Sequence, residues 1–210
     1  MESGGQPHPV REESPTQLRV RPARETDRAA VGHLLAVGFA DKFAPLFGRD
    51  HDRTAALLAE LPSSGTVYVA EESGQVVGTF TLVLEERPHP GVWPVLRRHL
   101  PFPSAVRALL LLQLLGSGRP DPHTALVEAV AVLPERRRRG VGRHMMAEAL
   151  AQARRAGRRW VGLYVVEDNT PALRLYTSLG FQVQRTHRLV WTRPLFGARR
   201  ILYMTADLGA

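Results

Sequence analysis

The pattern of apolar and polar positions predicts strands and helices that alternate along the first third of the chain. Residues 18–21 alternate apolar and charged side chains, as a half-buried strand does. A helical piece is expected over residues 53–61, and residues 66–70 and 76–84 flank the turn-forming Glu71-Glu-Ser-Gly74 as a hairpin would. Thr26 is a candidate helix cap, and the residues after it predict a helix. Its apolar stripe recurs at helical spacing, at Val31, Leu34, Leu35 and Gly38.

The second half of the chain repeats this alternation. Apolar, β-branched runs at residues 126–133 and 161–166 predict two buried strands, with a long helix over residues 141–156 between them. A short helix follows, with Thr170 as its cap, Pro171 at its first position and Gly180 just past its end. Two final strands are expected, at about residues 182–192 and 200–207.

Composition limits the classes of protein to consider. The chain has 210 residues, of which 44% are hydrophobic and 23% charged, as in an ordinary soluble globular protein. There is no cysteine, which excludes disulfides, zinc–thiolate sites and a cysteine nucleophile. Residues 1–17 are polar and lack the apolar core of a secretory signal, so we expect a disordered tail. A cytoplasmic location and no integral membrane association fit these features.

The densest basic cluster is Arg136-Arg-Arg-Arg-Gly-Val-Gly-Arg143, between a predicted strand and a predicted helix. Glycines let a backbone approach a phosphate closely, and the free N–H groups of a helix N-terminus attract anions. The spacing fits neither the dinucleotide fingerprint nor the P-loop. The cluster therefore predicts a site for a phosphorylated ligand. It also accounts for much of the net charge of +8, which leaves nucleic-acid binding without a motif of its own.

This cluster resembles the (Gln/Arg)-x-x-Gly-x-(Gly/Ala) pyrophosphate loop of the GNAT superfamily of N-acetyltransferases. Downstream, the segment Asn169-Thr-Pro-Ala-Leu-Arg-Leu-Tyr-Thr-Ser-Leu-Gly-Phe181 is similar to the segment that follows the loop in that family. The resemblance is specific over residues 126–181. It implies an α/β (α+β) fold, with a mixed, twisted sheet of about six to seven strands flanked by helices and splayed between the fourth and fifth strands.

The resemblance implies acetyl-CoA as cosubstrate, no metal, and direct transfer of an acetyl group to an amine. The pantetheine arm would pair with the backbone of Val130 and Val132, and Asn169 would hydrogen-bond near it. The pyrophosphate would lie on the loop, formed by Arg137, Arg138, Arg139, Gly140, Val141, Gly142 and Arg143. Of these side chains, that of Arg138 or of Arg143 is expected to reach the 3′-phosphate.

Two residues are candidates for the chemistry. Tyr176 is the expected general acid for the departing thiolate, because a phenol with a pKa near 10 stays neutral at pH 7; it also lies on an apolar helix face, as a core tyrosine would. Glu128 is the candidate base. On a regular strand, residues 126, 128, 130 and 132 share one face, which would place Glu128 beside the bound arm. Glu128 is equally suited to bind a cationic acceptor or to form an ion pair.

Residues 85–123 depart from the family's plan, in which a short turn joins the third and fourth strands. Seven prolines punctuate this insertion, and an apolar helix is expected at residues 104–115. The insertion and residues 39–47 are expected to border the acceptor pocket, although packing on the core or at a homodimer contact is equally open for the helix. We therefore expect one acetyltransferase domain over residues 18–210, with a small-molecule or protein amine as acceptor. The alternative is a non-catalytic acyl-CoA-binding or sensor module.

Overall fold

Seven strands form one mixed sheet in the computed structural model, which describes residues 18–85, 91–115, 121–188 and 200–209. The strand order is β1-β2-β3-β4-β5-β7-β6, and all neighbours are antiparallel except β4 and β5, which run parallel. This topology confirms the expected mixed sheet. The strands are β1 (Arg19–Pro22), β2 (Thr66–Glu72), β3 (Gln75–Val83), β4 (Thr124–Val132), β5 (Trp160–Val166), β6 (Gln182–Arg188) and β7 (Arg200–Asp207).

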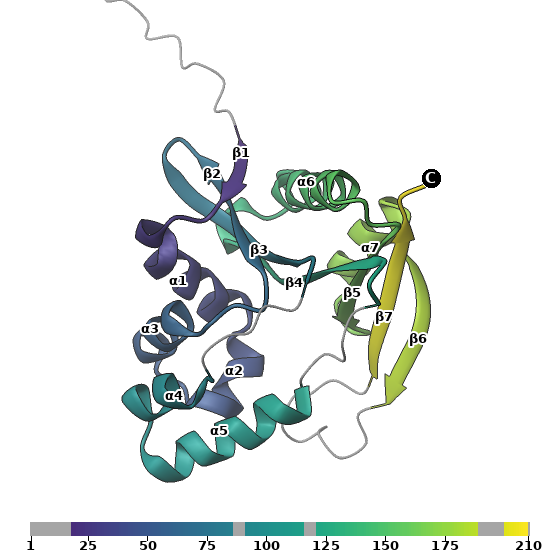
Figure 1. The fold of residues 1–210 in the computed structure, drawn as a ribbon. Coiled ribbons are helices and arrows are strands. Elements are labelled where there is room, and N and C mark those ends of the chain that lie inside the picture. The colour runs from purple at the N-terminus through teal and green to yellow at the C-terminus, as the bar shows by residue number, and fades with distance from the viewer. Residues whose placement is uncertain (1–17, 86–90, 116–120, 189–199, 210) are drawn as a thin grey trace, which may run out of the picture.

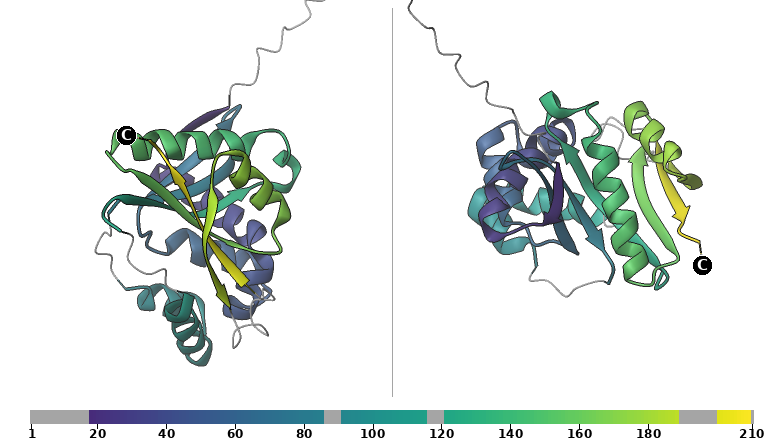
Figure 2. Two further views of the ribbon diagram at one scale, coloured as in Figure 1. Left: turned by 90° about the vertical axis from the view of Figure 1, so that its right-hand side faces the viewer. Right: turned by 90° about the horizontal axis from the view of Figure 1, so that it is seen from above.

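Helices flank the sheet on both sides (Figure 1). Five gather on one side: α1 (Arg28–Gly38), α2 (Ala40–Phe47), α3 (His51–Glu60), α4 (Trp93–His99) and α5 (Phe102–Leu115). The other two are α6 (Val141–Arg155) and α7 (Thr170–Ser178), and single 3-10 turns, η1 (Glu25–Asp27) and η2 (Pro134–Arg136), precede α1 and α6. Seen from above, α6 runs along the junction between the β1–β4 half of the sheet and the β5–β7–β6 half (Figure 2).

The main core lies between the sheet and α6 and α7. Phe80 of β3, Val127 of β4 and Leu163 of β5 meet the helices here, each at most 3% exposed. The long helix expected at residues 141–156 buries one apolar stripe, because the helical spacing of these residues keeps one face on the sheet. The members of this stripe are Val141, Met145, Met146, Ala149 and Ala153.

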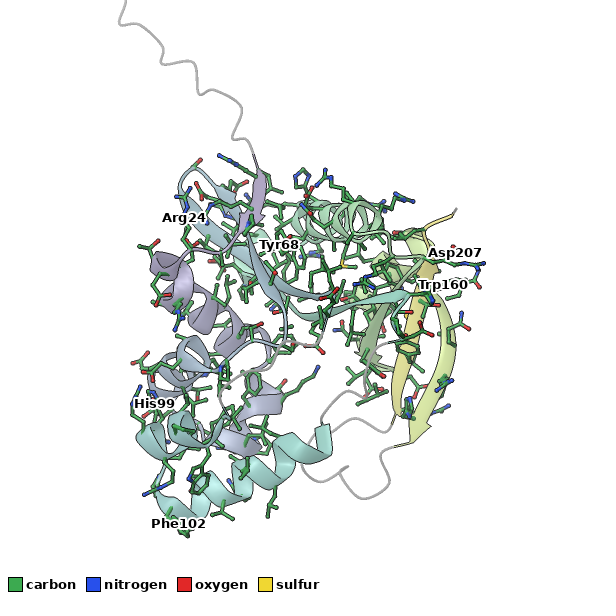
Figure 3. The ribbon with its side chains drawn as sticks, viewed as in Figure 1. Arg24, Tyr68, His99, Phe102, Trp160 and Asp207 are labelled. Atoms are coloured by element: carbon green, nitrogen blue, oxygen red, sulfur yellow. The ribbon has the colours of Figure 1, made fainter. Side chains whose placement is uncertain are left out.

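A second core holds the insertion against the helices of the first half. Leu96 of α4 and Ala105 and Ala108 of α5 are fully buried against residues of α1, α2 and α3. In Figure 3, His99 and Phe102 mark these insertion helices at the end of the molecule far from Trp160 and Asp207. Packing on a core, one of the two expectations for the helix at residues 104–115, is therefore observed, although that helix begins at Phe102 and α4 was not predicted.

A buried ion pair fixes the start of α1. The carboxylate of Asp27 accepts hydrogen bonds from Arg21 Nη1 and Nη2, at 2.6 and 3.1 Å, and from the backbone N–H of Arg24 at 2.6 Å. Arg21 Nε also donates to Glu71 of β2 at 2.8 Å. The hydrogen bonds from Arg21 lower the pKa of Asp27. This cluster ties the helix to the sheet edge formed by β1 and β2.

Most element boundaries lie within three residues of the predicted ones. The last strand has the predicted bounds, while β4 begins two residues early, at Thr124. The expected tail at residues 1–17 and the end of the sixth strand beyond residue 188 lie outside the described residues. Within the described part of the chain, no helix alone has the length and apolar character to cross a membrane, and only the bent pair at residues 25–38 and 40–47 passes that test jointly.

Candidate active site

The parallel strands β4 and β5 separate partway along their length. Their pairing runs from Thr124 opposite Trp160 to Val127 opposite Leu163 and stops there, although β4 continues to Val132. Among the residues that the structure describes, β5 pairs beyond this point only with β7, and β4 only with β3. Within this part of the chain, the backbone of residues 128–132 thus has one edge without a strand partner. The expected splay between the fourth and fifth strands is present at this position.

A β-bulge lies at the start of the splay. Thr81 is opposite Glu128 and Thr79 is opposite Ala131, so two residues of β4, Ala129 and Val130, correspond to one residue of β3. Ala129 takes a φ of +53°, a conformation that a residue with a side chain adopts only at a cost. The extra residue reverses the alternation of side chains along the strand.

The expectation that residues 126, 128, 130 and 132 share one face is therefore wrong. Cross-strand partners point to the same face, so Glu128 shares its face with Thr79, Thr81 and Ala131, on the side of α1. Val132 is opposite Gly78 and lies on the face of α6. Glu128 thus projects away from the main core, which explains how a carboxylate is accommodated in an apolar strand.

Glu128 lies in a cleft of about 890 Å³ between the sheet and the helices of the first half. The hydroxyl of Ser64 donates to Glu128 Oε2 at 2.7 Å, and this is the partner of Glu128 among the described residues. Val31 and Leu35 of α1 form one wall of the cleft, and Thr79 and Thr81 form part of the floor. A half-buried acid with a single neutral donor is able to accept a proton or bind a cation.

The insertion forms part of this cleft. Gly91 and the first turn of α4, at Pro94 and Val95, line it together with residues 58–67. Residues 39–47, which were also expected at the acceptor pocket, do not line it; residues of α2 border a separate hollow with Thr54. The cleft ends at Glu128 and Ala129 and does not reach the arginine-rich turn, which is an open surface.

The arginine-rich turn has the geometry of an anion site. Arg138 and Gly140 take positive φ values, +61° and +84°, and Gly140 caps the N-terminus of α6. The first helical hydrogen bond runs from the His144 N–H to the Gly140 carbonyl, at 3.0 Å. The N–H groups of residues 141–143 precede it and have no acceptor within the helix, so they remain available at its positive end.

The arginine side chains differ in their environments. Arg137 Nε donates to the carbonyl of Val132 at 3.1 Å and ties the turn to the end of β4. Arg143 donates to Ser178 Oγ of α7 at 2.8 Å, and Arg136 pairs with Glu72 at 3.2 Å. Arg138 and Arg139 are exposed. Of the two arginines expected at a 3′-phosphate, Arg138 is thus directed by no described contact, and Arg143 is held against α7.

Tyr176 of α7 lies on the face of the sheet opposite to Glu128. It is 7% exposed, belongs to the main core, and its ring lies 5.9 Å from that of Phe181. Burial raises the pKa of its phenol to about 12. The side chain therefore keeps its proton throughout the neutral range. Its core packing is observed, and its role as an acid stays a prediction.

Asn169 is the N-cap of α7, one residue earlier than expected. Its Oδ1 accepts the Ala172 N–H at 3.3 Å, and Thr170 is the first helical residue, so the prediction that Thr170 is the cap is wrong. The capping bond uses only the amide oxygen. The Nδ2 group keeps two donors for another partner. Capping thus does not compete with the expected contact to the pantetheine arm.

Three features of the site were missed by sequence reasoning. The bulge at Ala129 has no signal in a run of ordinary strand formers, and Ser64 is a loop residue far from Glu128 in sequence. The turn into α4 brings Val95 to the cleft, although prolines argued against a helix there. Within the described ranges, no group of three or more acidic, histidine or cysteine residues is placed to hold a metal ion.

A mixed sheet that opens between two parallel strands, followed by a glycine- and arginine-rich turn at the start of a helix, is the arrangement expected of the class of acetyltransferases that the sequence motifs indicated. The model of the Acetyltransferase (GNAT) family matches residues 35–181, and the chain belongs to this family.

A mycothiol acetyltransferase of Nocardiopsis dassonvillei is 47% identical over 72 residues, which are 34% of this chain. The match spans only 22% of that relative's own length. An acetyltransferase of Bacillus subtilis, solved in complex with CoA, has a TM-score of 0.58 at 16% identity and covers 91% of this chain and 99% of its own. A GNAT family acetyltransferase of Elizabethkingia anophelis, solved with acetyl-CoA bound, has a TM-score of 0.55 at 13% identity, covering 90% and 97%. These structures support the fold.

Proposed function

We propose that this chain transfers an acetyl group from acetyl-CoA directly to an amine. The observation that carries the proposal is the alignment of two features along β4. The strand loses its β5 partner after Val127, and a few residues later the chain forms the anion-binding turn before α6. A strand edge with which an extended arm can pair therefore leads directly to a turn suited to phosphates. The relatives solved with CoA or acetyl-CoA share this fold, which supports the choice of ligand.

The backbone supplies most of the proposed coenzyme seat. The N–H groups of Arg139, Gly140, Val141, Gly142 and Arg143 lie around the N-terminus of α6, where a diphosphate is favoured. The free edge of β4 offers Val130 and Val132 to the pantetheine arm as an added strand would use them. We assign the contact to the 3′-phosphate to Arg138, because the side chain of Arg143 already donates to Ser178. The amide donors of Asn169 complete the seat on the α7 side.

The proposed chemistry uses both faces of the sheet. The amine approaches from the cleft, and Glu128 accepts its proton as the nitrogen attacks the thioester carbon. The N–H of Val130, which lies in the bulge, stabilises the oxyanion that develops on the carbonyl oxygen. The C–N bond forms, the C–S bond breaks, and the departing thiolate takes the proton of Tyr176 from the other face. Holding both substrates at the opening supplies the remaining acceleration.

We further propose that residues 18–210 act as one catalytic domain, with the insertion at residues 85–123 as a wall of the acceptor site. The apolar residues of the cleft, among them Leu35 and Val95, favour an acceptor amine with an apolar portion. The matched relatives are named for mycothiol, but the match covers too little of their length to carry their acceptor to this chain.

A coenzyme-release assay over an amine panel tests this function. We expect the Tyr176→Phe and Glu128→Gln variants to lose at least about 100-fold in kcat, the lower range for a lost general acid or base. Both variants should bind acetyl-CoA as wild type does in calorimetry, because neither residue contacts the diphosphate seat. Undiminished turnover in both would remove their catalytic assignment. Tight coenzyme binding by a wild type that turns over no amine would favour the acyl-CoA-binding module instead.

A further inference from the structure

Tyr164 of β5 lies across the strand opening from Glu128. The register pairs Leu126 with Gly162 and Val127 with Leu163. Glu128 and Tyr164 are therefore the next residues of the two strands, at equivalent positions just past the last pair. Residues one step beyond the same pair lie on the same face of the sheet. Glu128 and Tyr164 therefore flank the opening on the acceptor side, each one residue past the last pairing. The described cleft contains no residue of β5, so Tyr164 belongs to a different surface.

Tyr164 forms an aromatic platform with a second tyrosine. Its ring centroid lies 4.9 Å from that of Tyr203 on β7, at an angle of 37° between the planes. His187 of β6 continues the surface, 6.2 Å from the Tyr164 ring. Tyr164 is 41% exposed, although it stands on a central strand. Three rings from three adjacent strands thus form one surface that no described element covers completely.

Gly162 leaves room for the Tyr203 ring over β5. A Cβ at this position would lie 2.7 Å from Tyr203 Oη and 2.9 Å from an edge carbon of the ring, closer than real Cβ contacts. The absence of a side chain at Gly162 therefore lets the Tyr203 ring lie where it does, tilted against that of Tyr164. Two features of the sequence, a glycine on β5 and a tyrosine on β7, therefore cooperate to make a ring surface next to the opening.

The rings of the platform, rather than a charge, determine what it can hold. Burial is the main cause of the raised pKa of Tyr203, and Tyr164, Arg185 and Asp121 also act on it. Arg185 and Asp121 thus bring one charge of each sign near Tyr203. A neutral ring gains most here, because offset or tilted contacts between aromatic rings add to the burial of their apolar area.

Building on the proposed function, we propose that the acceptor is an arylalkylamine, whose ring rests on Tyr164 and Tyr203 while its amine reaches Glu128. Paired strands lie about 4.8 Å apart, and β4 and β5 diverge beyond their last pair. The centre of the ring and the nitrogen are therefore separated by more than one strand spacing, a distance that a two-carbon linker allows and a one-carbon linker does not. The ring then stays outside the cleft, and the cleft beside Glu128 holds any substituents close to the amine.

The test compares 2-phenylethylamine with 2-cyclohexylethylamine, which has the same carbon skeleton without an aromatic face. Coenzyme release gives kcat/KM for each amine with wild type, Tyr164→Leu and Tyr203→Phe. We expect wild type to prefer the aromatic amine by about 3- to 10-fold, the range of an aromatic pair contact. Tyr164→Leu should bring the ratio close to one, and Tyr203→Phe, which keeps the ring, should retain it. Val183→Ala, at an exposed apolar residue on the other face of the same half-sheet, is the control.

The outcomes separate this inference from the proposed function. The platform is not an acceptor site if Tyr164→Leu leaves the ratio of kcat/KM for the two amines unchanged. The same holds if Tyr164→Leu changes the KM for acetyl-CoA and not the KM for the amine. A change of ratio in Val95→Ala instead of Tyr164→Leu would place the ring in the cleft and also overturn it. Turnover of other amines, but of neither 2-phenylethylamine nor 2-cyclohexylethylamine, would also overturn the inference. Failure of wild type to bind acetyl-CoA would refute the proposed function itself.

Discussion

Replacing Gly140 by alanine tests whether coenzyme binding depends on the backbone geometry of the arginine-rich turn. The effect of this change on binding can be compared with its effect on the stability of the fold. Gly140 takes a φ of +84° at the N-cap of α6, and an added Cβ would meet nothing within 4 Å. The change therefore costs only the strain of a left-handed residue with a side chain, about 1–2 kcal/mol. For a chain of this length, each kcal/mol lowers Tm by roughly 2–4 °C. The variant should fold, with Tm lower by several degrees.

The effect on coenzyme binding should exceed the effect on folding. The added methyl group would stand in the turn where the proposed diphosphate approaches, and any shift of the turn moves the N–H groups of residues 141–143. Losing one hydrogen bond to a charged group costs about 1.5–3 kcal/mol, which is a loss of roughly 10- to 150-fold in affinity. Calorimetric titration with acetyl-CoA measures this directly.

Gly74 provides a matched control. It takes a φ of +79° in the turn between β2 and β3, and a Cβ there would also meet nothing within 4 Å. Gly74→Ala should lower Tm as Gly140→Ala does and leave the affinity for acetyl-CoA unchanged. Equal affinities in wild type and Gly140→Ala, together with equal losses of Tm in the two variants, would show that the turn does not hold the diphosphate.

Three further predictions concern single groups. In an alkaline absorbance titration, the difference between wild type and Tyr176→Phe should show one phenol ionising near pH 12, because burial raises its pKa to about 12; a difference centred near pH 10 would contradict its burial. Ser64→Ala should lower kcat/KM roughly fivefold, the value of one hydrogen bond, without changing acetyl-CoA affinity; no change in kcat/KM would show that the Ser64 contact with Glu128 is incidental. Asp27→Asn should reduce the free energy of urea unfolding at pH 7 by about 2 kcal/mol, through loss of charged hydrogen bonds to Arg21. Because the folded pKa of Asp27 is lowered, that stabilisation is complete above the unfolded pKa and is lost as pH falls through the folded one, so the two proteins should converge in acid; a difference that persists in acid would contradict this.

The elements that the sequence predicted are those with a strong local pattern. The stripe of α6 and the bounds of β7 were visible because their apolar positions repeat with one period. The arginine-rich turn was predicted because glycine and the start of a helix coincide there. In each of these cases the information lies within about ten consecutive residues, where periodicity and turn chemistry operate.

The features that could not be predicted depend on contacts between distant parts of the chain. Ala129 forms a bulge because β4 has one more residue than β3 over the same stretch, and neither strand alone shows this. The bulge reversed the face of Glu128, so an argument from regular alternation gave the wrong side. Ser64 meets Glu128 across 64 residues of sequence.

Proline accounts for the missed helix in the insertion. Pro94 lies in the first turn of α4, where no N–H is needed, and Pro103 lies in the first turn of α5 in the same way. A helix was expected at residues 104–115, and the prolines argued against one before it, but the position of Pro94 allows α4. Tertiary packing of Leu96 and Leu100 then holds α4 in the second core.

We propose that β4 and the turn after it hold acetyl-CoA so that its acetyl group is passed to an amine from the Glu128 side. The most direct measurement is a reaction of wild-type protein with acetyl-CoA and an amine panel, with free thiol and acetylated amine quantified together. The account predicts equal molar amounts of the two products, dependent on the amine. Thiol release that is independent of any amine, or no binding of acetyl-CoA at all, would contradict it.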